Sequence, residues 1–383
     1  MRHQNTVFHG VLKQLPWSEF DCLVEKHGSD ARVRTLSTRS QMVALLYAQL
    51  SGASSLREIE AVLESHGGKL YHLGAAKVKR STLADANAAR PAALFGELLS
   101  QLIARAHSSL RRKLEDTVYL IDSTPLLLTS LSKWARFSIK MHAAKLHMIY
   151  DPDADHPIYA ELTHANVNDI TIAKEMPIEP GATYVFDLGF YDYGWWARLA
   201  DAGCRIVTRF KKNTPLDVIE ELALPEGSEI LSDKIGRLPQ RQAMRRKNPF
   251  GDPVREVRIK TPTGKVLRLM TNDLDAPAQE IADLYKRRWA IELFFRWVKQ
   301  TLKIKHFIGA SENAVRIQIA IALIAFLLLR LAQAAAKLGT SALTFARLVR
   351  ANLMQRRNLD HIWRPPDPIA PSSTQLILDL AHA

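Results

Sequence analysis

Between residues 117 and 210, short apolar segments rich in β-branched residues alternate with segments of helical pattern, and this alternation limits the possible folds. Apolar runs of about four to eight residues bounded by turn residues are typical of strands. The expected strands are Thr117–Asp122, Lys140–Tyr150, Pro157–Leu162, Thr183–Asp187 and Arg205–Phe210, and the expected helices are Asn168–Glu175 and Tyr193–Ala202. Strands that alternate with helices indicate an α/β layer.

The segments on either side of this layer have different patterns. Residues 1–113 show helical spacing of apolar residues with short turns, which predicts an all-helical N-terminal domain. Residues 214–275 carry Pro and Gly turns between alternating segments, which predicts a β-rich insertion with hairpins. The α/β layer is therefore expected to occupy 114–213 and to resume with helices over 276–345, followed by an irregular tail over 346–383.

The chain carries a large excess of positive charge. Its 52 Lys and Arg against 39 Asp and Glu give a net charge of +13, with a pI near 9.7. A polyanionic partner is expected, and nucleic acid is the commonest one. Residues 1–113, with 16 basic and 9 acidic residues, suit a DNA-reading module, although a helical bundle with a solvated basic face has the same periodicity. Residues 234–268 hold 11 basic and 2 acidic residues, for which we favour contact with DNA phosphates over a solvated edge.

Export and membrane insertion are not expected from the sequence. The N-terminus is mixed and polar, unlike a secretory signal. Two cysteines, Cys22 and Cys204, are too few for a disulfide framework or a cysteine zinc site, and fit a reducing compartment. The most apolar run, Ile317–Leu329, has 13 residues, fewer than the roughly 20 that a spanning helix needs, so a buried core helix is expected.

Three acidic residues far apart in the sequence form the most specific chemical pattern. Asp122 and Asp187 each end an apolar strand, and sites form at the carboxyl ends of strands in parallel sheets. An Asx turn is a further use for Asp122. Glu292 lies on a long helix expected over about Asp275–His306. Three carboxylates in one pocket are ligands that Mg²⁺ prefers, and two such ions roughly 3.5–4 Å apart can clamp a phosphodiester for attack by an oxygen.

The long helix places its functional side chains on one face. At about 100° per residue, a single arc of about 60° beside the apolar face holds Tyr285, Arg288, Glu292 and Lys299. For Glu292 alone, an i,i+4 ion pair with Arg288 is the structural alternative, and the two aspartates shift the balance toward a functional site. The basic residues around Glu292, including Arg296 and Lys303, are expected to hold phosphates.

Several further side chains have two interpretations. Trp289 and Trp297 flank Glu292 and could stack on a flipped base, but we favour core packing because aromatic residues on helices are usually buried. Alternate positions of one expected strand carry Lys140, His142, Lys145 and His147. These side chains could face DNA, and a zinc site among them is not expected. Asn166 and Asp169 are interpreted as caps of the helix that follows.

The order Asp122, Asp187, Glu292 resembles the DDE triad of cut-and-paste transposases. The helix reads Tyr285-(2)-Arg288-(3)-Glu292-(6)-Lys299, which is similar to the YREK signature of the insertion sequence 4 family in all four residues and all three gaps. The segment Asp187-Leu-Gly-Phe resembles the second-Asp segment of that family, and the β-rich stretch resembles its insertion. The segments that begin at Arg2 and Ser51 are similar to the N-terminal domain of such bacterial transposases. The likeness extends over most of the chain, to about residue 345.

The resemblance implies an RNase H-like catalytic domain that the β-rich insertion interrupts between the second Asp and the Glu. It implies that Asp122, Asp187 and Glu292 are catalytic and bind two Mg²⁺ ions, for which Mn²⁺ can substitute. Arg288 and Lys299 are implied to contact DNA phosphates near the cleavage point. Tyr285 is implied to contact the backbone there as well, and to help if a hairpin intermediate forms.

The predicted function is that of a DNA transposase acting as a homodimer on the paired inverted-repeat ends of an insertion sequence. It hydrolyses phosphodiesters at the ends and joins the 3′-hydroxyls to target DNA by phosphoryl transfer. Two alternatives stay open, namely an inactive DNA-binding regulator with the same fold and a structure-specific nuclease that cleaves without joining. The expected partner is double-stranded DNA, and the expected location is the bacterial cytoplasm, at the nucleoid when DNA is bound.

Overall fold

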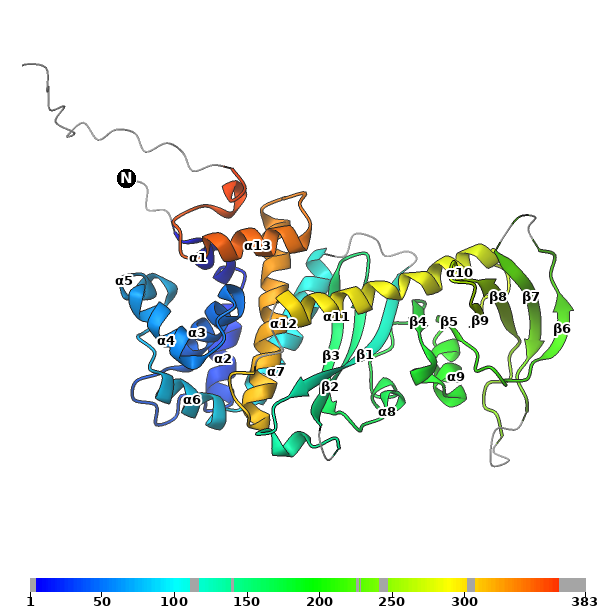
Figure 1. Ribbon diagram of the computed structural model, residues 1–383, viewed down its shortest axis with the longest axis horizontal. Helices are drawn as coiled ribbons and strands as arrows, with labels where there is room; N and C mark the ends of the chain where they lie inside the picture. The colour runs from blue at the N-terminus through cyan, green and yellow to red at the C-terminus, as the bar shows by residue number, and fades with distance from the viewer. Residues whose placement is uncertain are drawn as a thin grey trace, which may run out of the picture.

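The computed structural model describes residues 5–110, 117–138, 141–224, 227, 229–240, 247–301 and 307–364. Lys303, the ends of several predicted segments and the chain beyond residue 364 lie outside the described residues. Figure 1 shows an elongated molecule with the N-terminal helices at one end, a sheet in the middle and the strands of the β-rich segment at the other end.

The described residues before residue 111 form helices. These are α1 (Val7–Leu12), α2 (Trp17–Lys26), α3 (Thr38–Ser51), α4 (Leu56–Ser65), α5 (Gly67–Leu70), the 3₁₀ turn η1 (Tyr71–Leu73), α6 (Arg80–Ala89) and α7 (Ala92–Leu110). The side chains of Thr6, Ser37 and Ser55 begin three of them by accepting hydrogen bonds from backbone N–H groups of the first turn. The helical pattern predicted for this part of the sequence is therefore present.

Within the described residues, one nine-stranded mixed sheet follows, in the order β3-β2-β1-β4-β5-β9-β8-β7-β6. The strands are β1 (Val118–Leu128), β2 (His142–Asp151), β3 (His156–His164), β4 (Thr183–Phe186), β5 (Arg205–Arg209), β6 (Asp217–Glu221), β7 (Ile230–Arg237), β8 (Val254–Lys260) and β9 (Val266–Thr271). Strands β1, β2 and β3 pair antiparallel, β4 and β5 run parallel to β1, and β9 returns antiparallel to β5. The predicted mixed α/β fold is confirmed, and the β-rich segment extends the same sheet.

Helices cover both faces of the sheet. They are α8 (Asp169–Ala173), α9 (Tyr193–Asp201), α10 (Ala278–Arg287), α11 (Trp289–Thr301), α12 (Glu312–Ala335) and α13 (Ala342–Asn352), with short 3₁₀ turns η2 (Lys133–Ala135), η3 (Leu188–Phe190) and η5 (Leu359–His361). Tyr119, Phe186 and Trp196 belong to the core on the α8 and α9 side. Leu120 and Val185 belong to the core on the α10, α11 and α12 side. This division follows from the alternation of side chains along each strand.

The first strand is longer than predicted. The prediction ended it at Asp122, whereas β1 continues to Leu128. Its parallel pairing with β4 stops at Ile121, but its antiparallel pairing with β2 goes on to the end of the strand. Asp122 therefore lies inside β1, at the point where one of its two neighbouring strands ends.

The helix predicted over about Asp275–His306 is divided within its described part. At Arg288 the hydrogen bonds tighten, because the Arg288 N–H donates to Tyr285 O and the Ile291 N–H donates to Arg288 O, each over three residues. Such 3₁₀-type bonds interrupt the regular α-helical ladder. The result is two consecutive helices, α10 and α11, that run across one face of the sheet (Figure 1).

Helix α12 is the central helix of the molecule. It is the one helix among the described residues that is long and apolar enough to cross a membrane, yet 89% of its apolar window is buried inside the protein. It packs against α3 and α7 of the N-terminal helices and against α13. The core helix predicted around Ile317–Leu329 is therefore present, and it joins the N-terminal helices and the sheet in one hydrophobic core.

Candidate active site

Asp122 and Asp187 lie side by side where β1 and β4 stop pairing. The strand register pairs Ile121 of β1 with Phe186 of β4, and the residue that follows each of them is an aspartate. The alternation of side chains along β1 directs Asp122 toward the face that α11 covers. The Asp187 carboxylate accepts a hydrogen bond from the Gly189 N–H at 2.8 Å. A β-carbon at Gly189 would lie 3.1 Å from the same oxygen, so this close approach favours glycine.

Arg288 and Glu292 reach this pair from the helices above the sheet. Arg288 stands at the junction of α10 and α11, and Glu292 follows one turn later. Arg288 Nη2 lies 2.6 Å from Glu292 Oε1, and Arg288 Nη1 lies 3.4 Å from Asp122 Oδ2. The i,i+4 ion pair considered as an alternative is present, and the same guanidinium also binds the aspartate of β1. One arginine thus links Glu292 to Asp122.

The surroundings of Asp122 disfavour its charged form. The pKa of the Asp122 carboxyl is raised to about 6, mainly by burial and to a smaller extent by the negative charges of Asp187 and Glu292. The Ser123 N–H, which donates to Asp122 Oδ1 at 2.8 Å, and the Arg288 guanidinium act in the opposite direction. Both other carboxylates therefore lie within electrostatic reach of Asp122.

The three carboxylates have the chemistry of a divalent-ion site. Within the described part of the chain, their oxygens do not form a set in which all atoms lie within 4.8 Å of one another. Instead, the Arg288 guanidinium supplies the positive charge to Asp122 and Glu292. Carboxylate oxygens are the donors that hard cations such as Mg²⁺ prefer. The residues therefore fit a divalent ion, which would compete with Arg288 for these oxygens.

Tyr285 and Lys299 contact the same region of the sheet. Tyr285 is 8% exposed, and burial raises its pKa, an effect that the positive charges of Arg288 and Arg209 and their hydrogen bonds only partly offset. The Lys299 Nζ group donates a hydrogen bond to Thr124 Oγ1 on β1. The predicted helical arc consists of Tyr285, Arg288, Glu292 and Lys299. Each of these side chains contacts β1, β5 or another member of the arc.

A cavity of about 400 Å³ opens beside Asp122 and Glu292. It is lined by Asp122, Ser123, Thr124, Glu292, Phe295, Arg296, Lys299 and Gln300. Asp122 comes from β1, whereas Glu292 and the cations Arg296 and Lys299 come from α11. Cationic side chains next to a carboxylate pocket can bind the phosphates of a nucleic-acid strand that enters the pocket. Arg296, for which the sequence predicted a phosphate contact, lines this cavity, and Lys303 lies outside the described residues.

Asp169 belongs to the same region, and its interpretation as a helix cap is wrong. Asp169 Oδ1 accepts hydrogen bonds from Ser123 Oγ at 2.8 Å and from Lys145 Nζ at 3.0 Å. A β-carbon at Gly189 would lie 3.1 Å from Asp169 Oδ2 and 3.1 Å from Asp187 Oδ1. Asp169 is therefore a fourth carboxylate beside the candidate site, held by the residue that follows Asp122.

Two residues of the alternating strand pattern, Lys145 and His147, contact this fourth carboxylate. His147 Nδ1 lies 3.5 Å from Asp169 Oδ1, next to the Lys145 contact. Burial lowers the pKa of His147 to about 4, against the opposing effect of the Asp169 charge. The alternation of Lys145 and His147 was visible in the sequence, but their partner was not, because it lies more than 20 residues away. Lys140 lies outside the described residues.

The two tryptophans of α11 have different environments. Trp297 packs in the core with its ring centroid 4.8 Å from that of Phe326, as predicted. The same prediction is wrong for Trp289, which is 55% exposed. Trp289 shares one helical stripe with Leu293 and Arg296, which are also exposed, because residues three to four positions apart lie on the same side of a helix.

Three arginines of the basic β-rich stretch are paired within the sheet. Arg255 is 4% exposed and donates to both oxygens of Asp233, from Nε at 2.8 Å and from Nη2 at 2.7 Å. Glu256, which is 1% exposed, pairs with Arg258 at 2.6 Å and also with Arg268. The charge excess in this stretch is therefore partly structural, and the prediction of phosphate contact does not hold for the buried Arg255.

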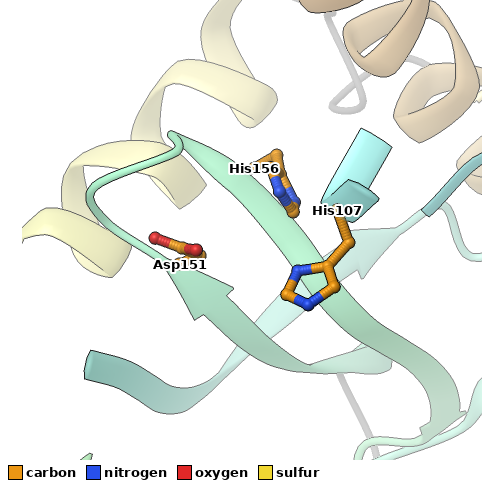
Figure 2. Close-up of side chains that lie close together, drawn as sticks. All are labelled: His107, Asp151 and His156. Carbon is orange, nitrogen blue, oxygen red and sulfur yellow. The ribbon is translucent and has the colours of Figure 1, made fainter. Parts of the chain in front are cut away.

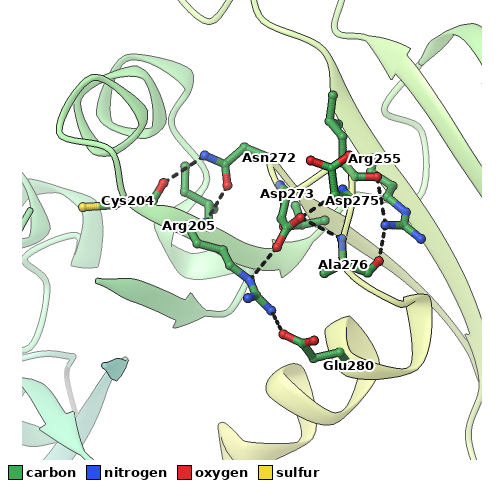
Figure 3. A network of polar contacts seen from close by, with 11 residues as sticks. Cys204, Arg205, Arg255, Asn272, Asp273, Asp275, Ala276 and Glu280 are labelled. Atoms are coloured by element: carbon green, nitrogen blue, oxygen red, sulfur yellow. Dashed lines mark hydrogen bonds and ion pairs between the residues drawn. The ribbon is translucent and has the colours of Figure 1, made fainter. Parts of the chain in front are cut away.

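A polar network at the start of α10 fixes the position of α10 and α11 (Figure 3). Asp273 Oδ1 accepts hydrogen bonds from the backbone N–H groups of Asp275 at 3.0 Å and Ala276 at 2.9 Å. Its other oxygen lies 3.2 Å from Arg205 Nε, and Arg205 also binds Glu280 on α10. The network ties the end of β9 and the first turn of α10 to β5.

Comparisons with known proteins show the family of the chain. Residues 113–328 match the family model of the transposase DDE domain, and residues 3–76 match a domain of unknown function, DUF4372. The first match spans more than half of the chain, and the chain therefore belongs to the family of DDE-domain transposases. A solved piggyBac transposase synaptic complex with hairpin DNA covers 94% of this chain and 81% of that chain, with 10% identity and a TM-score of 0.44, which is too weak a likeness to support an argument.

Three relatives carry transposase names. The protein y4zB of Sinorhizobium fredii is 42% identical over 294 residues, which are 76% of this chain and 81% of y4zB. The protein named for insertion sequence element IS5377 of Geobacillus stearothermophilus is 27% identical over 335 residues, covering 86% of this chain and 85% of that one. The protein named for insertion sequence element IS4SA of Synechocystis is 26% identical over 305 residues, covering 77% and 84%.

Proposed function

We propose that this chain cleaves DNA at the paired ends of an insertion sequence and joins the freed 3′-hydroxyls to target DNA. Asp122, Asp187 and Glu292 are the proposed catalytic residues, and they would hold two Mg²⁺ ions, or Mn²⁺ in their place. When bound, such ions activate the attacking oxygen and stabilise the leaving oxygen. The observation that carries the proposal is the convergence of Asp122 and Glu292 on Arg288, with Asp187 adjacent in the strand register.

The cations around the acids would position the DNA. Lys299 and Arg296 line the cavity beside the carboxylates. Lys303, which lies outside the described residues, is also proposed to contact DNA. The Arg288 guanidinium would be available to a phosphate if metal ions neutralised the carboxylates, and the Tyr285 hydroxyl beside it would contact the same backbone. Phosphoryl transfer depends mainly on positioning and charge stabilisation, so the protein needs little covalent chemistry of its own.

We also propose the narrower family and fold that the sequence resemblance implies. The family is insertion sequence 4, with its YREK signature at Tyr285, Arg288, Glu292 and Lys299. The fold is an RNase H-like core, supported by the antiparallel strands β1, β2 and β3, the parallel strands β4 and β5, and helices on both faces. The strands β6 to β9 would be the insertion between the second Asp and the Glu.

Double-stranded DNA is the proposed partner, with the net charge of +13 as support. A homodimer would place one set of acids at each of the two paired ends. The proposed location is the bacterial cytoplasm, at the nucleoid when DNA is bound. The N-terminal helices and the exposed lysines of the β-rich segment, Lys260 and Lys265, are proposed as further DNA contacts.

End cleavage in the presence of Mg²⁺ or Mn²⁺ tests the proposal. The substrate is a duplex that carries the inverted repeats flanking the coding region. Asp122→Ala, Asp187→Ala and Glu292→Ala should each lose cleavage while end binding at low salt survives. The matched control is Glu312→Ala, because Glu312 forms the same kind of i,i+4 ion pair, with Arg316 at 2.8 Å, on another helix.

The products of the same assay separate the alternatives. Cleavage together with joined strands supports a transposase, whereas cleavage that never yields joined strands supports a nuclease. Binding of the end duplex without cleavage by the wild-type chain supports an inactive regulator. Cleavage retained in one of the three alanine variants removes that residue from the proposed catalytic set.

A further inference from the structure

Three side chains from three elements gather between α7 and the β2–β3 hairpin (Figure 2). His107 lies in the last turn of α7, Asp151 ends β2 and His156 begins β3. One possible ligand atom of each lies within 4.8 Å of the other two. Among the described residues they form the one group of three or more His, Cys, Asp or Glu side chains with this spacing.

The hairpin holds two members of this cluster. Asp151 and His156 are cross-strand partners next to the turn. Asp151 Oδ1 accepts hydrogen bonds from the backbone N–H groups of Asp153 and Ala154, each at 2.9 Å, which fixes the carboxylate in an Asx turn. Arg330 of α12 donates to Ala154 O at 3.1 Å and so holds the turn against the core helix. The positions of these two side chains therefore follow from the backbone.

His156 presents a ring nitrogen with a free electron pair. Its side chain is fully buried, and Nδ1 lies 2.9 Å from Pro157 O. Because a carbonyl oxygen only accepts, Nδ1 carries the proton and Nε2 carries the electron pair. Nε2 is buried and has no hydrogen-bond partner in the described part of the chain. A buried polar atom without a partner is costly, and a metal ion would satisfy it.

His107 supplies a second imidazole to the cluster, and the carboxylate of Glu179 lies near it. The rings of His107 and His156 meet edge to face, with centroids 5.9 Å apart. His107 Nε2 also lies 3.9 Å from Glu179 Oε2. Metal-binding histidines commonly have a carboxylate near their second nitrogen, which orients the ring. The His107 side chain is 26% exposed, so solvent reaches the cluster from this side.

We propose that His107, Asp151 and His156 bind a borderline divalent ion such as Zn²⁺, with solvent completing the coordination. Two imidazoles and one carboxylate suit zinc, whereas Mg²⁺ prefers oxygen ligands alone. The bound ion ties α7 to the β2–β3 hairpin and thereby links the N-terminal helices to the sheet. None of the three residues belongs to the acidic site, so this inference stands apart from the proposed function.

Metal titration of the full-length, chelator-stripped chain tests this site. Zn²⁺ is titrated in excess Mg²⁺, which occupies the acidic site, and Co²⁺ is titrated in parallel because its visible absorption reports nitrogen ligands. The wild-type chain should bind about one Zn²⁺ and gain a higher Tm. His107→Gln and His156→Gln should weaken Zn²⁺ binding on the order of 100-fold or more and lose the gain in Tm.

Further variants separate ligand loss from misfolding. Asp151→Asn keeps a side-chain oxygen for the Asx turn, so it should retain the metal-free Tm and still bind Zn²⁺ more weakly. His164→Gln, at an exposed histidine of the same strand β3, is the matched control, and Asp122→Asn controls for the acidic site; both should bind Zn²⁺ like the wild type. Absence of Zn²⁺ binding by the wild type, unchanged binding in the His107 and His156 variants, or loss of binding in Asp122→Asn would each overturn the inference.

Discussion

At Asp122, burial and two neighbouring carboxylates oppose ionisation, and Arg288 and the Ser123 N–H only partly offset them. A buried acid of this kind lowers the stability of the folded chain at neutral pH, unlike an acid in a well-formed ion pair. Unfavourable electrostatics of this type concentrate at functional sites, where a ligand relieves them. A cation bound to the three acids would have that effect here.

The Asp122→Asn variant should be more stable than the wild type near neutral pH when divalent ions are absent. The folded-state pKa of about 6 lies above the ordinary value of 3.8, so the folded chain binds the extra proton between these values. Wild-type stability therefore falls as the pH rises through this range, by up to about 3 kcal/mol, and the variant does not share the loss. Urea unfolding at about pH 4 and about pH 7 measures the effect. A stability difference that does not change with pH would contradict it.

Asp169→Asn should slow end cleavage and leave end binding intact. Asp169 holds Ser123 and Lys145 beside the site, so it positions the strand rather than contacting DNA. We expect a decrease in cleavage rate on the order of 10–100-fold, as for other residues that orient a ligand. Asp201→Asn, at an exposed carboxylate at the end of α9, is the control. Equal cleavage rates in the two variants would remove Asp169 from the site.

At the scale of elements, the helix pair α10 and α11 decides where Glu292 lies. The apolar face of α11 packs on the sheet through Ile291, Phe294 and Val298. The tightened turn at Arg288 and the network around Asp273 set where the pair begins and how it crosses the strands. The position of Glu292 relative to β1 therefore depends on contacts made at the far end of α10.

Asp273→Ala should destabilise the chain and reduce end cleavage. The substitution removes the acceptor for the N–H groups of Asp275 and Ala276, and it also removes one partner of Arg205. We expect a loss of about 2 kcal/mol in the free energy of unfolding, measured in urea. Asp275→Ala, at an exposed side chain of the same turn, should lose much less. Equal losses in both variants would show that the network does not anchor α10.

At the scale of the whole molecule, α12 is the shared partner of both ends. Its side chains are buried against α3 and α7 on one side and against the helices and strands of the sheet on the other. The boundary predicted at residue 113 follows the change in sequence pattern, but the hydrophobic core continues across it. The N-terminal helices thus complete their core with a helix that comes about 200 residues later in the chain.

The fragment 1–113 should not fold cooperatively by itself. Without α12, the leucines of α3 and α7 lose their cover and present apolar surface to water. Urea unfolding and binding of a hydrophobic dye measure this expectation. A chain that ends at residue 364 keeps the helices seen in the structure and should unfold as cooperatively as the full chain. A sharp unfolding transition of the fragment 1–113 would instead support an independent N-terminal domain.

Local pattern made several elements predictable. Alternating and apolar runs indicated β2, β3, β4 and β5 because strand periodicity is a property of neighbouring residues. The spacing of Tyr285, Arg288, Glu292 and Lys299 indicated one shared helical face for the same reason. The ends of β1 were not predictable, because pairing with β2 continues the strand after its pairing with β4 has stopped.

The sequence by itself determined the strand and helix pattern, the charge of the chain and the acidic residues and spacing on which its resemblance to transposases rests, because all of these are read along the polymer. Only the tertiary structure decided which groups meet. Asp169 beside Asp187, Arg288 between Asp122 and Glu292, and the cluster around His156 all depend on register and packing between distant segments. Such contacts form only when the buried core fixes every element at once.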